Sequence, residues 1–274
     1  MSLHLQIKQK AAWLRQELFE MFLRARQGHP GSVFSQIEIT AVLYYGGVLK
    51  YKHGNPAWPD RDKVIVSKGH ATMGLYPILS DIGYFPEEEL AKYGSGEGIL
   101  RIFGNITIPG IEVTTGSLAH GQGVGAGFAY SSKKDRSNCK TFVILSEGEM
   151  YEGSVWETAL FASHHKLDNL TLVIDRNRNI ILGDTEDLVG LSPVEDKWRA
   201  FGWDTYTVDG HSIEELLDAF RQANNTNGKP KVIVANTVKG KGSSIMEHRP
   251  EWHYWQGMTD DEIDFTRREL RETP

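Results

Sequence analysis

The sequence predicts an α/β fold, a doubly wound and mainly parallel sheet flanked by helices, and two observations indicate it. Short runs rich in valine and isoleucine alternate along the chain with longer stretches whose apolar residues recur at helical spacing. The strand-like runs are apolar almost without interruption, as in strands buried on both faces of a parallel sheet. This alternation is typical of successive strand–helix–strand units.

The individual elements follow from these patterns. We expect strands at 64–67, 141–146, 170–175, 205–209 and 231–238. We expect helices between them at 35–46, 72–81, 118–133, 153–166 and 212–225. Residues 94–117 are rich in glycine and proline and show neither pattern. A loop of this length inside a compact domain is usually functional or lid-like.

Helices are also predicted at both ends of the chain. Residues 3–26 have apolar side chains at helical spacing, and Gly28 and Pro30 end this helix. Residues 259–272 are strongly charged and open with Thr259 and Glu262 in capping-box spacing, which predicts a solvated helix. No internal repeat or linker interrupts the chain, so we expect residues 1–274 to form a single domain.

Composition excludes several classes of protein. The 274 residues carry a formal net charge of −6 with no block of lysine or arginine, which argues against a nucleic-acid partner. A single cysteine, Cys139, rules out a disulfide framework and fits a reducing compartment. The apolar runs are of strand length and the N-terminus lacks a signal-peptide core, so we expect no membrane span. A cytoplasmic protein is expected.

Oxygen-bearing side chains follow two of the predicted strands. Glu147 and Gly148 come directly after 141–146, and Asn177 and Asn179 follow 170–175. Neighbouring parallel strands place such residues at adjacent carboxyl ends, where open α/β sheets bind ligands. One carboxylate, one amide oxygen and free carbonyls suit Mg²⁺ or Ca²⁺ better than Zn²⁺. The segment therefore predicts an anchor for a metal ion and a diphosphate.

Several histidines are placed where they can face the same edge. His29 lies in the rigid turn Gly-His-Pro-Gly, His70 follows the strand 64–67, and His253 lies about a dozen residues beyond the Lys-Gly-Lys-Gly-Ser run that starts at Lys239. A helix cap is an equally good interpretation of His29 taken alone. No HExxH, GxSxG, Walker or GxGxxG motif is present, so the common hydrolase, NTPase and dehydrogenase classes lack support.

These motifs, in this order, resemble the thiamine-diphosphate domain of transketolases in its split, N-terminal-subunit form. The resemblance runs through nearly the whole chain. It rests on GHPG at 28–31, SKGH at 67–70, EVTTGSL at 112–118, EGEMYEG at 147–153, KLDNLTLVIDRN at 166–177 and KGKGSS at 239–244. The implied cofactors are thiamine diphosphate and Mg²⁺, or Ca²⁺ or Mn²⁺ in its place.

The resemblance implies a role for each matching position. Glu147, the Asn177 side chain and the Asn179 carbonyl would hold the metal on the cofactor's diphosphate. The backbone of Gly148 would approach the diphosphate, and Gly116 and Leu118 would address the aminopyrimidine. Further residues implied to bind the cofactor are Ser117, Glu149, Asn177 and His70.

The remaining implied roles are catalytic. His29, His70 and His253 would contact the diphosphate or the hydroxyls of the donor sugar and relay protons. Glu152 would match a buried glutamate that links paired active sites in the family. Asn105 stands in the loop position where the family usually has a histidine that touches the sugar near its carbonyl.

Two departures from the family pattern bear on this chemistry. Ser146-Glu147-Gly148 replaces the usual Gly-Asp-Gly, so the metal carboxylate is one methylene longer. Mg²⁺ prefers near-ideal octahedral geometry and Ca²⁺ is more tolerant, so the choice of metal is affected. Asn105 can form hydrogen bonds but cannot exchange a proton near neutral pH, which indicates an altered donor sugar or altered proton handling.

The resemblance also implies a partner. In the family, a glutamate from a pyrimidine-binding domain activates the cofactor, and no such domain follows His253 in this chain. A C-terminal subunit, carrying the pyrimidine-binding and C-terminal domains, would complete the site in an α2β2 assembly. The implied reaction moves a two-carbon ketol unit from a phosphorylated or otherwise anionic ketose to an aldose. The alternatives are an enzyme like 1-deoxyxylulose-5-phosphate synthase and a non-catalytic paralogue.

Overall fold

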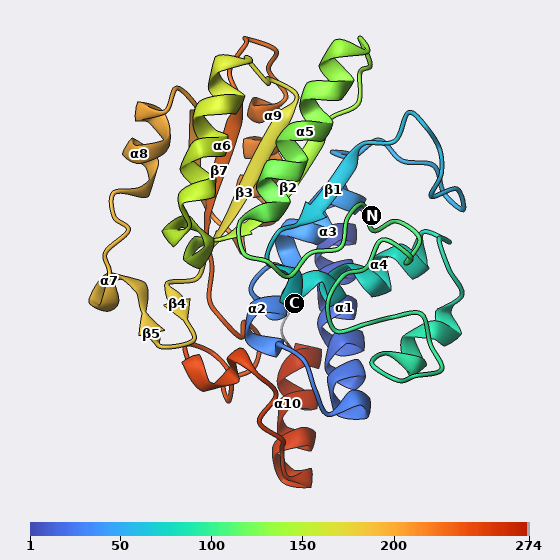
Figure 1. The fold of residues 1–274 in the computed structure, drawn as a ribbon. Coiled ribbons are helices and arrows are strands. Elements are labelled where there is room, and N and C mark those ends of the chain that lie inside the picture. The colour runs from blue at the N-terminus through green and yellow to red at the C-terminus, as the bar shows by residue number, and fades with distance from the viewer. Residues whose placement is uncertain (273–274) are drawn as a thin grey trace.

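A five-stranded parallel sheet forms the centre of the protein in the computed structural model, which describes residues 1–272 (Figure 1). Its strand order is β1-β2-β3-β7-β6. The strands are β1 (Lys63–Val66), β2 (Thr141–Ser146), β3 (Leu170–Arg176), β6 (Asp204–Asp209) and β7 (Lys231–Asn236). A short antiparallel hairpin, β4 (Asn179–Ile180) with β5 (Gly183–Asp184), follows β3.

Helices cover both faces of the sheet, and each face has its own buried apolar cluster (Figure 1). One face carries α5 (His120–Lys134), α6 (Gly153–His164) and α8 (Val194–Ala200). The other carries α1 (Leu3–Ala25), α2 (Pro30–Phe34), α3 (Ile37–Tyr45), α4 (Tyr76–Asp81) and α9 (Ile213–Ala223). The predicted doubly wound α/β fold is therefore confirmed.

The chain reverses direction across the sheet, and the reversal locates a crevice. The connections from β1 to β2, from β2 to β3 and from β3 to β6 each return to the sheet through a helix on one face, α5, α6 or α8, although the first also includes α4 on the other face. The connection from β6 back to β7 runs through α9 on the opposite face, as right-handed crossovers require. After β7 the chain continues to α10 (Asp260–Glu272), which packs against α1. The chain after β3 thus leads to one face of the sheet and the chain after β7 to the other, and such switch points are where open α/β sheets bind ligands.

The predicted strands all form, within one or two residues of their expected bounds at most ends. The expected helix 35–46 forms as α3, which runs from Ile37 to Tyr45, and the short helix α2, which ends at Phe34, precedes it. The expected helix 72–81 begins as a 3-10 helix, η1 (Gly69–Leu75), before α4. Residues 94–117 contain no helix or strand, as expected. The expected C-terminal helix is α10, while residues 273–274 lie outside the described part of the chain.

Short elements were not predicted, because they span too few residues to show a hydrophobic period. They are α7 (Thr185–Leu188), α8, and the 3-10 helices η2 (Glu87–Lys92), η3 (Glu147–Tyr151) and η4 (Pro250–His253). Helix α10 also differs from a fully solvated helix: Thr266 and Leu270 are buried, and Arg267 pairs with Glu20 of α1 at 2.8 Å. Among residues 1–272, no helix combines the length and apolarity needed to cross a membrane.

Glycines let α5 lie unusually close to the sheet. A Cβ atom added at Gly125 would come 2.5 Å from Cγ2 of Val143 in β2, whereas one added at Gly127 would meet nothing within 4 Å. The two positions share one helix and differ only in the face they occupy. Gly121, one turn earlier in α5, is equally close, since a Cβ atom there would come 2.7 Å from Cα of Ser67 after β1, and the start of α5 therefore lies against the strand ends that form the site.

We expect Gly125→Ala to lower the free energy of unfolding by about 1–3 kcal/mol, because the new methyl group overpacks the helix–sheet contact. Gly127→Ala is the matched control and should raise it by about 0.5–1 kcal/mol through helix propensity alone. Chemical denaturation of the isolated chain measures both. Equal effects of the two substitutions would contradict the close approach at Gly125.

Candidate active site

The candidate site lies at the carboxyl ends of β1, β2, β3 and β7, and a buried ion pair holds these ends together. Lys68, directly after β1, pairs with Asp175 near the end of β3, and both side chains are fully buried. The Lys68 ammonium also donates to the Ser32 carbonyl at 2.8 Å. Asp175 in turn accepts hydrogen bonds from Ser35 and from Thr237, which follows β7. One buried carboxylate thereby ties together β1, β3, β7 and α2.

The charge of Asp175 is maintained despite its burial. Burial alone would raise the pKa of this carboxyl, but Lys68 and the hydrogen-bond donors outweigh it and lower the pKa below its ordinary value. Asp175 is thus an ionised carboxylate at neutral pH that is already fully engaged. It forms the floor of the site and is not free to bind a ligand.

The Gly-His-Pro-Gly turn brings the segment after β7 to the site. Gly28 has a left-handed φ of +114°, and Pro30 occupies the first turn of α2, where a missing N–H costs nothing. The backbone N–H of Gly240 donates to the Gly31 carbonyl at 3.0 Å, and the N–H of Trp255 donates to the Gly28 carbonyl at 2.9 Å. These bonds place His29 next to residues more than two hundred positions later in the chain.

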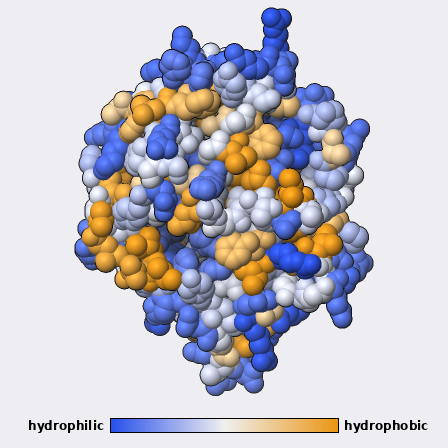
Figure 2. All heavy atoms as spheres, in the orientation of Figure 1, coloured by the Kyte–Doolittle hydropathy of each residue, from blue (hydrophilic) through white to orange (hydrophobic). Residues whose placement is uncertain are grey.

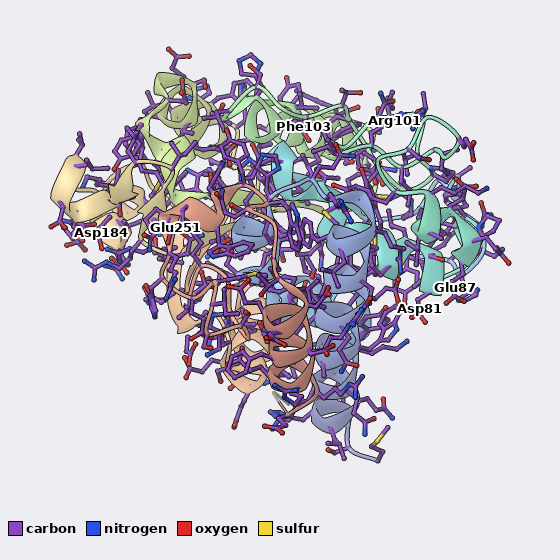
Figure 3. The ribbon with its side chains drawn as sticks, turned by 90° about the horizontal axis from the view of Figure 1, so that it is seen from below. Asp81, Glu87, Arg101, Phe103, Asp184 and Glu251 are labelled. Atoms are coloured by element: carbon purple, nitrogen blue, oxygen red, sulfur yellow. The ribbon has the colours of Figure 1, made fainter. Side chains whose placement is uncertain are left out.

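Three histidines meet above this floor. The ring centroids lie 5.0 Å apart for His29–His70, 5.3 Å for His29–His253 and 5.0 Å for His70–His253. Two exposed aromatic side chains flank His29, with Phe103 at 5.8 Å and Tyr254 at 5.0 Å. In Figure 3, Glu251 of η4 and Asp184 of β5 lie toward the same side of the view, and Phe103 of the 94–117 loop lies apart from them. The structure therefore brings together the three histidines that the sequence singled out.

All three histidines are neutral near physiological pH. Burial, reinforced by Lys239, lowers the pKa of His29 to about 4 and that of His253 to about 3. Burial and the two neighbouring imidazoles hold the pKa of His70 well below its ordinary value. Nδ1 of His29 is buried and has no hydrogen-bond partner among residues 1–272. A neutral imidazole offers one donor and one acceptor, so this cluster can bind hydroxyl groups and exchange protons with them.

Glu147 is a buried carboxylate of the site that lacks partners. It is 1 % exposed, and neither of its oxygens makes a hydrogen bond with the described residues. The nearest cationic atom is Nε of Arg176, at 4.0 Å. Burial, with a contribution from Asp175, raises the pKa of Glu147 to about 8, and Arg176 and the backbone of Arg178 oppose this rise only partly. A buried carboxylate without partners is a candidate ligand, because it is costly in any other role.

The other predicted metal ligands follow the adjacent strand. Asn177 is buried, and its Oδ1 accepts from the Asn179 N–H at 3.1 Å, which leaves the second lone pair of this oxygen unused. The Asn179 carbonyl lies 3.4 Å from Nζ of Lys239. Because β2 and β3 pair with Ser146 opposite Asp175, Glu147 and Asn177 follow neighbouring strand ends.

This donor set fits a hard divalent cation held partly by a second group. Within residues 1–272, no three or more His, Cys, Asp and Glu side chains cluster as metal ligands would. One carboxylate, one amide oxygen and one carbonyl leave about three of six octahedral positions for water and phosphate oxygens. The unpartnered Glu147 carboxylate supports this fit. A diphosphate-bound cation suits the site better than a metal held by protein side chains alone.

Backbone access for a flat or anionic group is provided by glycines. A Cβ atom at Gly69 would come 2.6 Å from the Gly116 nitrogen, so the loop after β1 touches the 112–118 motif directly. Gly116 has a φ of +154°, and Gly116, Ser117 and Leu118 are all exposed. Gly148 is only partly buried and lies next to Glu147. These residues line the site with backbone atoms rather than with charge.

Glu149 was predicted to bind the cofactor, but its side chain is fully buried and is hydrogen-bonded within the chain. Its carboxylate accepts hydrogen bonds from the Ser67 hydroxyl at 2.6 Å, the Ala119 N–H at 2.8 Å and the Ser146 N–H at 2.8 Å. Both oxygens are therefore engaged within the chain. They join the end of β1, the start of α5 and the end of β2.

Two predicted catalytic residues lie outside the histidine cluster. Glu152 is exposed at the N-cap of α6, and its side chain forms no capping hydrogen bond there. Asn105 uses its Oδ1 to accept from the Thr107 N–H at 2.9 Å, which closes a turn in the 94–117 loop. The cluster itself is built from the three histidine rings with Phe103 and Tyr254.

Several residues that shape the site carry no clear signal in the sequence. Lys239 is 1 % exposed and reaches Nδ1 of His253 at 3.4 Å as well as the Asn179 carbonyl, and burial lowers its pKa to about 8. The Lys68–Asp175 pair and the contact of Phe103 with His29 were not predicted either. A lysine or aspartate at a strand end is a weak signal, because the partner that keeps it charged lies far away in sequence.

Comparison with known proteins places this fold and site in one family. Residues 8–274 match the family described as the transketolase thiamine-diphosphate-binding domain. The chain is 38 % identical over 240 residues to an apulose-4-phosphate transketolase subunit of Phocaeicola vulgatus, a match that covers 88 % of this chain and 85 % of the relative. It is 37 % identical over 248 residues to a 6-deoxy-6-sulfo-D-fructose transketolase subunit of a Clostridium species, covering 90 % of each.

Solved structures agree with this assignment. The transketolase of Campylobacter jejuni superposes with a TM-score of 0.90 at 30 % identity, over 97 % of this chain but only 43 % of that one. The transketolase of Leishmania mexicana gives 0.85 at 26 % identity and is covered to 45 %. The chain thus spans less than half the length of these transketolases.

The chain belongs to the transketolase family, in its thiamine-diphosphate-binding domain. Within that family it corresponds to the N-terminal subunit of a split transketolase, a transferase of ketol groups.

The raised pKa of Glu147 predicts how the free energy of unfolding depends on pH. In the metal-free chain, its folded pKa of about 8 exceeds its ordinary value of 4.5, so the folded state binds more protons in between and the free energy of unfolding falls as pH rises through this window. We expect Glu147→Gln to be more stable than wild type by about 1–3 kcal/mol at pH 9 and nearly equal to it at pH 5. Denaturant unfolding at both pH values measures this, and a variant that is less stable at pH 9 would contradict it.

The Lys68–Asp175 pair makes a second prediction. Asp175→Asn should lower the free energy of unfolding by about 3–5 kcal/mol, because it leaves a buried lysine without its counter-charge. Asp218→Asn is the control, since Asp218 pairs with Arg221 on an exposed helix face, and it should change stability by less than about 0.5 kcal/mol. Thermal and denaturant unfolding of both variants provide the comparison, and similar losses in the two would disprove the central role of the pair.

Proposed function

We propose that this chain binds thiamine diphosphate through a divalent cation and, with a second subunit, transfers a two-carbon ketol unit from an anionic ketose to an aldose. The observation that carries the proposal is the buried, unpartnered carboxylate of Glu147 at the strand ends that hold Asn177 and Asn179. Thiamine diphosphate, when bound, supplies the carbon that takes up the ketol group. The residues of this chain bind, orient and exchange protons.

The cation is assigned to Glu147, the Asn177 amide oxygen and the Asn179 carbonyl. Mg²⁺ is the preferred metal, with Ca²⁺ or Mn²⁺ as substitutes, because all three ligands are hard oxygens. The diphosphate is assigned to the Gly148 backbone and to the Lys239 ammonium, which already lies near the carbonyl oxygens that follow β3.

The flat ring of the cofactor is assigned to the exposed 112–118 motif. It would lie against Gly116, Ser117 and Leu118, where backbone atoms are accessible. Glu149 supports these contacts by positioning Ala119 and Ser146, and does so from inside the protein.

The histidine cluster is assigned to the sugar. His29, His70 and His253 are neutral, and their ring centroids lie 5.0 to 5.3 Å apart. They can therefore bind successive hydroxyl groups of a linear ketose and pass protons between them. Asn105 lies on the 94–117 loop with Phe103, whose ring contacts His29. From there its amide can orient a sugar oxygen without exchanging a proton.

The substrate is proposed to be a ketose with an anionic group at its far end. The named substrates of two relatives are apulose 4-phosphate and 6-deoxy-6-sulfo-D-fructose, which carry a phosphate and a sulfonate respectively. Those relatives match this chain over most of their length. The choice between phosphate and sulfonate is assigned to the partner subunit.

A partner subunit is supported by apolar side chains around the site. Leu118 is 42 % exposed, and Ile181, Leu182, Leu188 and Val189 on the neighbouring segment are 47, 77, 45 and 63 % exposed. Figure 2 shows apolar surface over the region of the β4–β5 hairpin and α7. Contiguous exposed apolar surface of this kind marks an interaction site. We assign it to a C-terminal subunit that carries the pyrimidine-binding domain, in an α2β2 assembly whose second copy of this chain would bury Glu152.

The proposal is tested with the chain and a C-terminal partner subunit, to be sought in the adjacent reading frame, in the presence of Mg²⁺ and thiamine diphosphate. We expect cofactor-dependent ketol transfer from a phosphorylated or sulfonated ketose. Replacing His29 or His70 by alanine should lower turnover by about 10²–10⁴-fold while thermal stability changes little. His4→Ala, on an exposed turn of α1, is the control and should retain full turnover.

Two outcomes would oppose the proposal. If no thiamine diphosphate binds even with the partner present, the chain is a non-catalytic paralogue. If alanine at His29 or His70 unfolds the protein in proportion to its effect on turnover, these histidines are structural.

A further inference from the structure

Arg176, the last residue of β3, connects Glu147 to the segment that covers one side of the site. Its Nε faces Oε2 of Glu147 at 4.0 Å. Its Nη2 donates to the Ser192 hydroxyl at 2.7 Å and lies 3.5 Å from Glu186, and its Nη1 lies 3.7 Å from Glu195. The side chain is 13 % exposed. One guanidinium thus lies within 4.0 Å of carboxylates from three separate elements.

The contact with Glu147 is incomplete on both sides. Within residues 1–272, Nε of Arg176 is buried and has no hydrogen-bond partner, and neither oxygen of Glu147 has one. The two groups face each other at a distance too long for a hydrogen bond but short enough for a strong electrostatic restraint. The Nη1 and Nη2 atoms of this arginine point instead to Glu186, Ser192 and Glu195.

Glu147 needs such a restraint more than an aspartate would. The chain carries glutamate where the family pattern has aspartate, so the carboxylate has one more rotatable bond and reaches about 1.5 Å further. Its ligand geometry must be selected from more rotamers, and Mg²⁺ tolerates little deviation. Arg176 stands at the side of Glu147, where it can select one rotamer.

A cation next to a metal ligand also repels the metal, so the charges decide the sign of the effect. Glu186 and Glu195 lie near the Nη atoms of the guanidinium and neutralise it. With all three carboxylates ionised, Arg176, Glu147, Glu186 and Glu195 together carry three negative charges and one positive charge. The repulsion is therefore offset, while the Nε donor remains directed at Glu147.

From this geometry we propose that Arg176 is a positioning residue that holds the longer carboxylate of Glu147 in its metal-binding rotamer, and that the chain depends on it because Glu147 replaces an aspartate. The inference rests on the proposed function, since it presupposes a divalent cation at Glu147. It makes Arg176 and Glu147 an interdependent pair: the arginine matters for glutamate and not for the shorter side chain.

A double-mutant cycle tests this dependence. Mn²⁺ is titrated into the chain with its partner subunit and thiamine diphosphate, and bound Mn²⁺ is followed by electron paramagnetic resonance, independently of turnover. We expect Arg176→Met to weaken Mn²⁺ binding by about 10–100-fold, the usual cost of losing a residue that orients a metal ligand. In the Glu147→Asp background, the same substitution should weaken binding by less than about 3-fold. Arg176→Lys, which keeps the charge without the fork, should fall between.

Arg178→Met is the matched control. Arg178 lies two residues further along, its side chain is 57 % exposed, and its ion-pair partner is Asp184, at 4.0 Å. We expect Mn²⁺ affinity to stay within about 2-fold of wild type, since exposed pairs contribute little. Thermal unfolding shows whether each variant is folded, and Arg176→Lys serves as the test if Arg176→Met is not.

Each outcome decides the question. Equal weakening by Arg176→Met in the Glu147 and Glu147→Asp backgrounds would mean that the arginine supports the fold generally, and would overturn the inference. Unchanged or tighter Mn²⁺ binding in Arg176→Met would show that repulsion dominates, and would also overturn it. If wild type itself binds no Mn²⁺ with thiamine diphosphate, the proposed function fails, and the inference fails with it.

Discussion

The ion pair between Lys68 and Asp175 lies where four segments of the chain converge, and the candidate site depends on it. Both side chains are buried, and the pair is stable only because Ser32, Ser35 and Thr237 satisfy the remaining hydrogen bonds. These partners come from α2 and from the segment after β7. An apolar pair of the same volume would fill the space but could not fix the direction of these backbones. The buried charge pair thus holds the segments that carry the histidines and the oxygen-rich edge.

Two kinds of electrostatic environment lie side by side above this floor. His29 is buried, His70 and His253 are partly buried, and Lys239 lies nearby, so their pKa values are lowered and they stay neutral. Glu147 is buried and makes no side-chain hydrogen bond within residues 1–272, so its pKa is raised, which fits the cation proposed for it. Asp175, at similar depth, has a lowered pKa because its partners are in place. The contrast between the two carboxylates separates a structural residue from a candidate ligand, although burial alone would not.

The family assignment explains why the site faces outward. The transketolases of solved structure are more than twice as long as this chain, and the matching part is their thiamine-diphosphate-binding domain. Relatives that this chain matches over most of their length are named as subunits, which implies a partner subunit. The proposed partner surface would account for the exposed apolar residues beside the site, among them Leu118 and Leu182. Glu152 is exposed, and its place at a surface between subunits remains part of the proposal.

Much of this protein was determined by sequence alone. Apolar runs predicted every strand of the main sheet, and the residues that follow β2 and β3 predicted the oxygen-rich edge, because local hydrophobic period and strand ends depend only on neighbouring residues. The six sequence motifs, in their fixed order, predicted the family to which the chain belongs.

Only the tertiary structure decided which polar side chains are free to bind a ligand. Glu147 and Glu149 lie two positions apart and look alike in sequence, yet among the described residues one has no hydrogen-bond partner and the other is fully engaged with Ser67, Ala119 and Ser146. In the same way, the contacts of Lys68, Lys239 and Arg176 come from segments distant in sequence. Charge state and ligand capacity depend on burial and on contacts between remote parts of the chain, and these exist only once the strands and loops have come together.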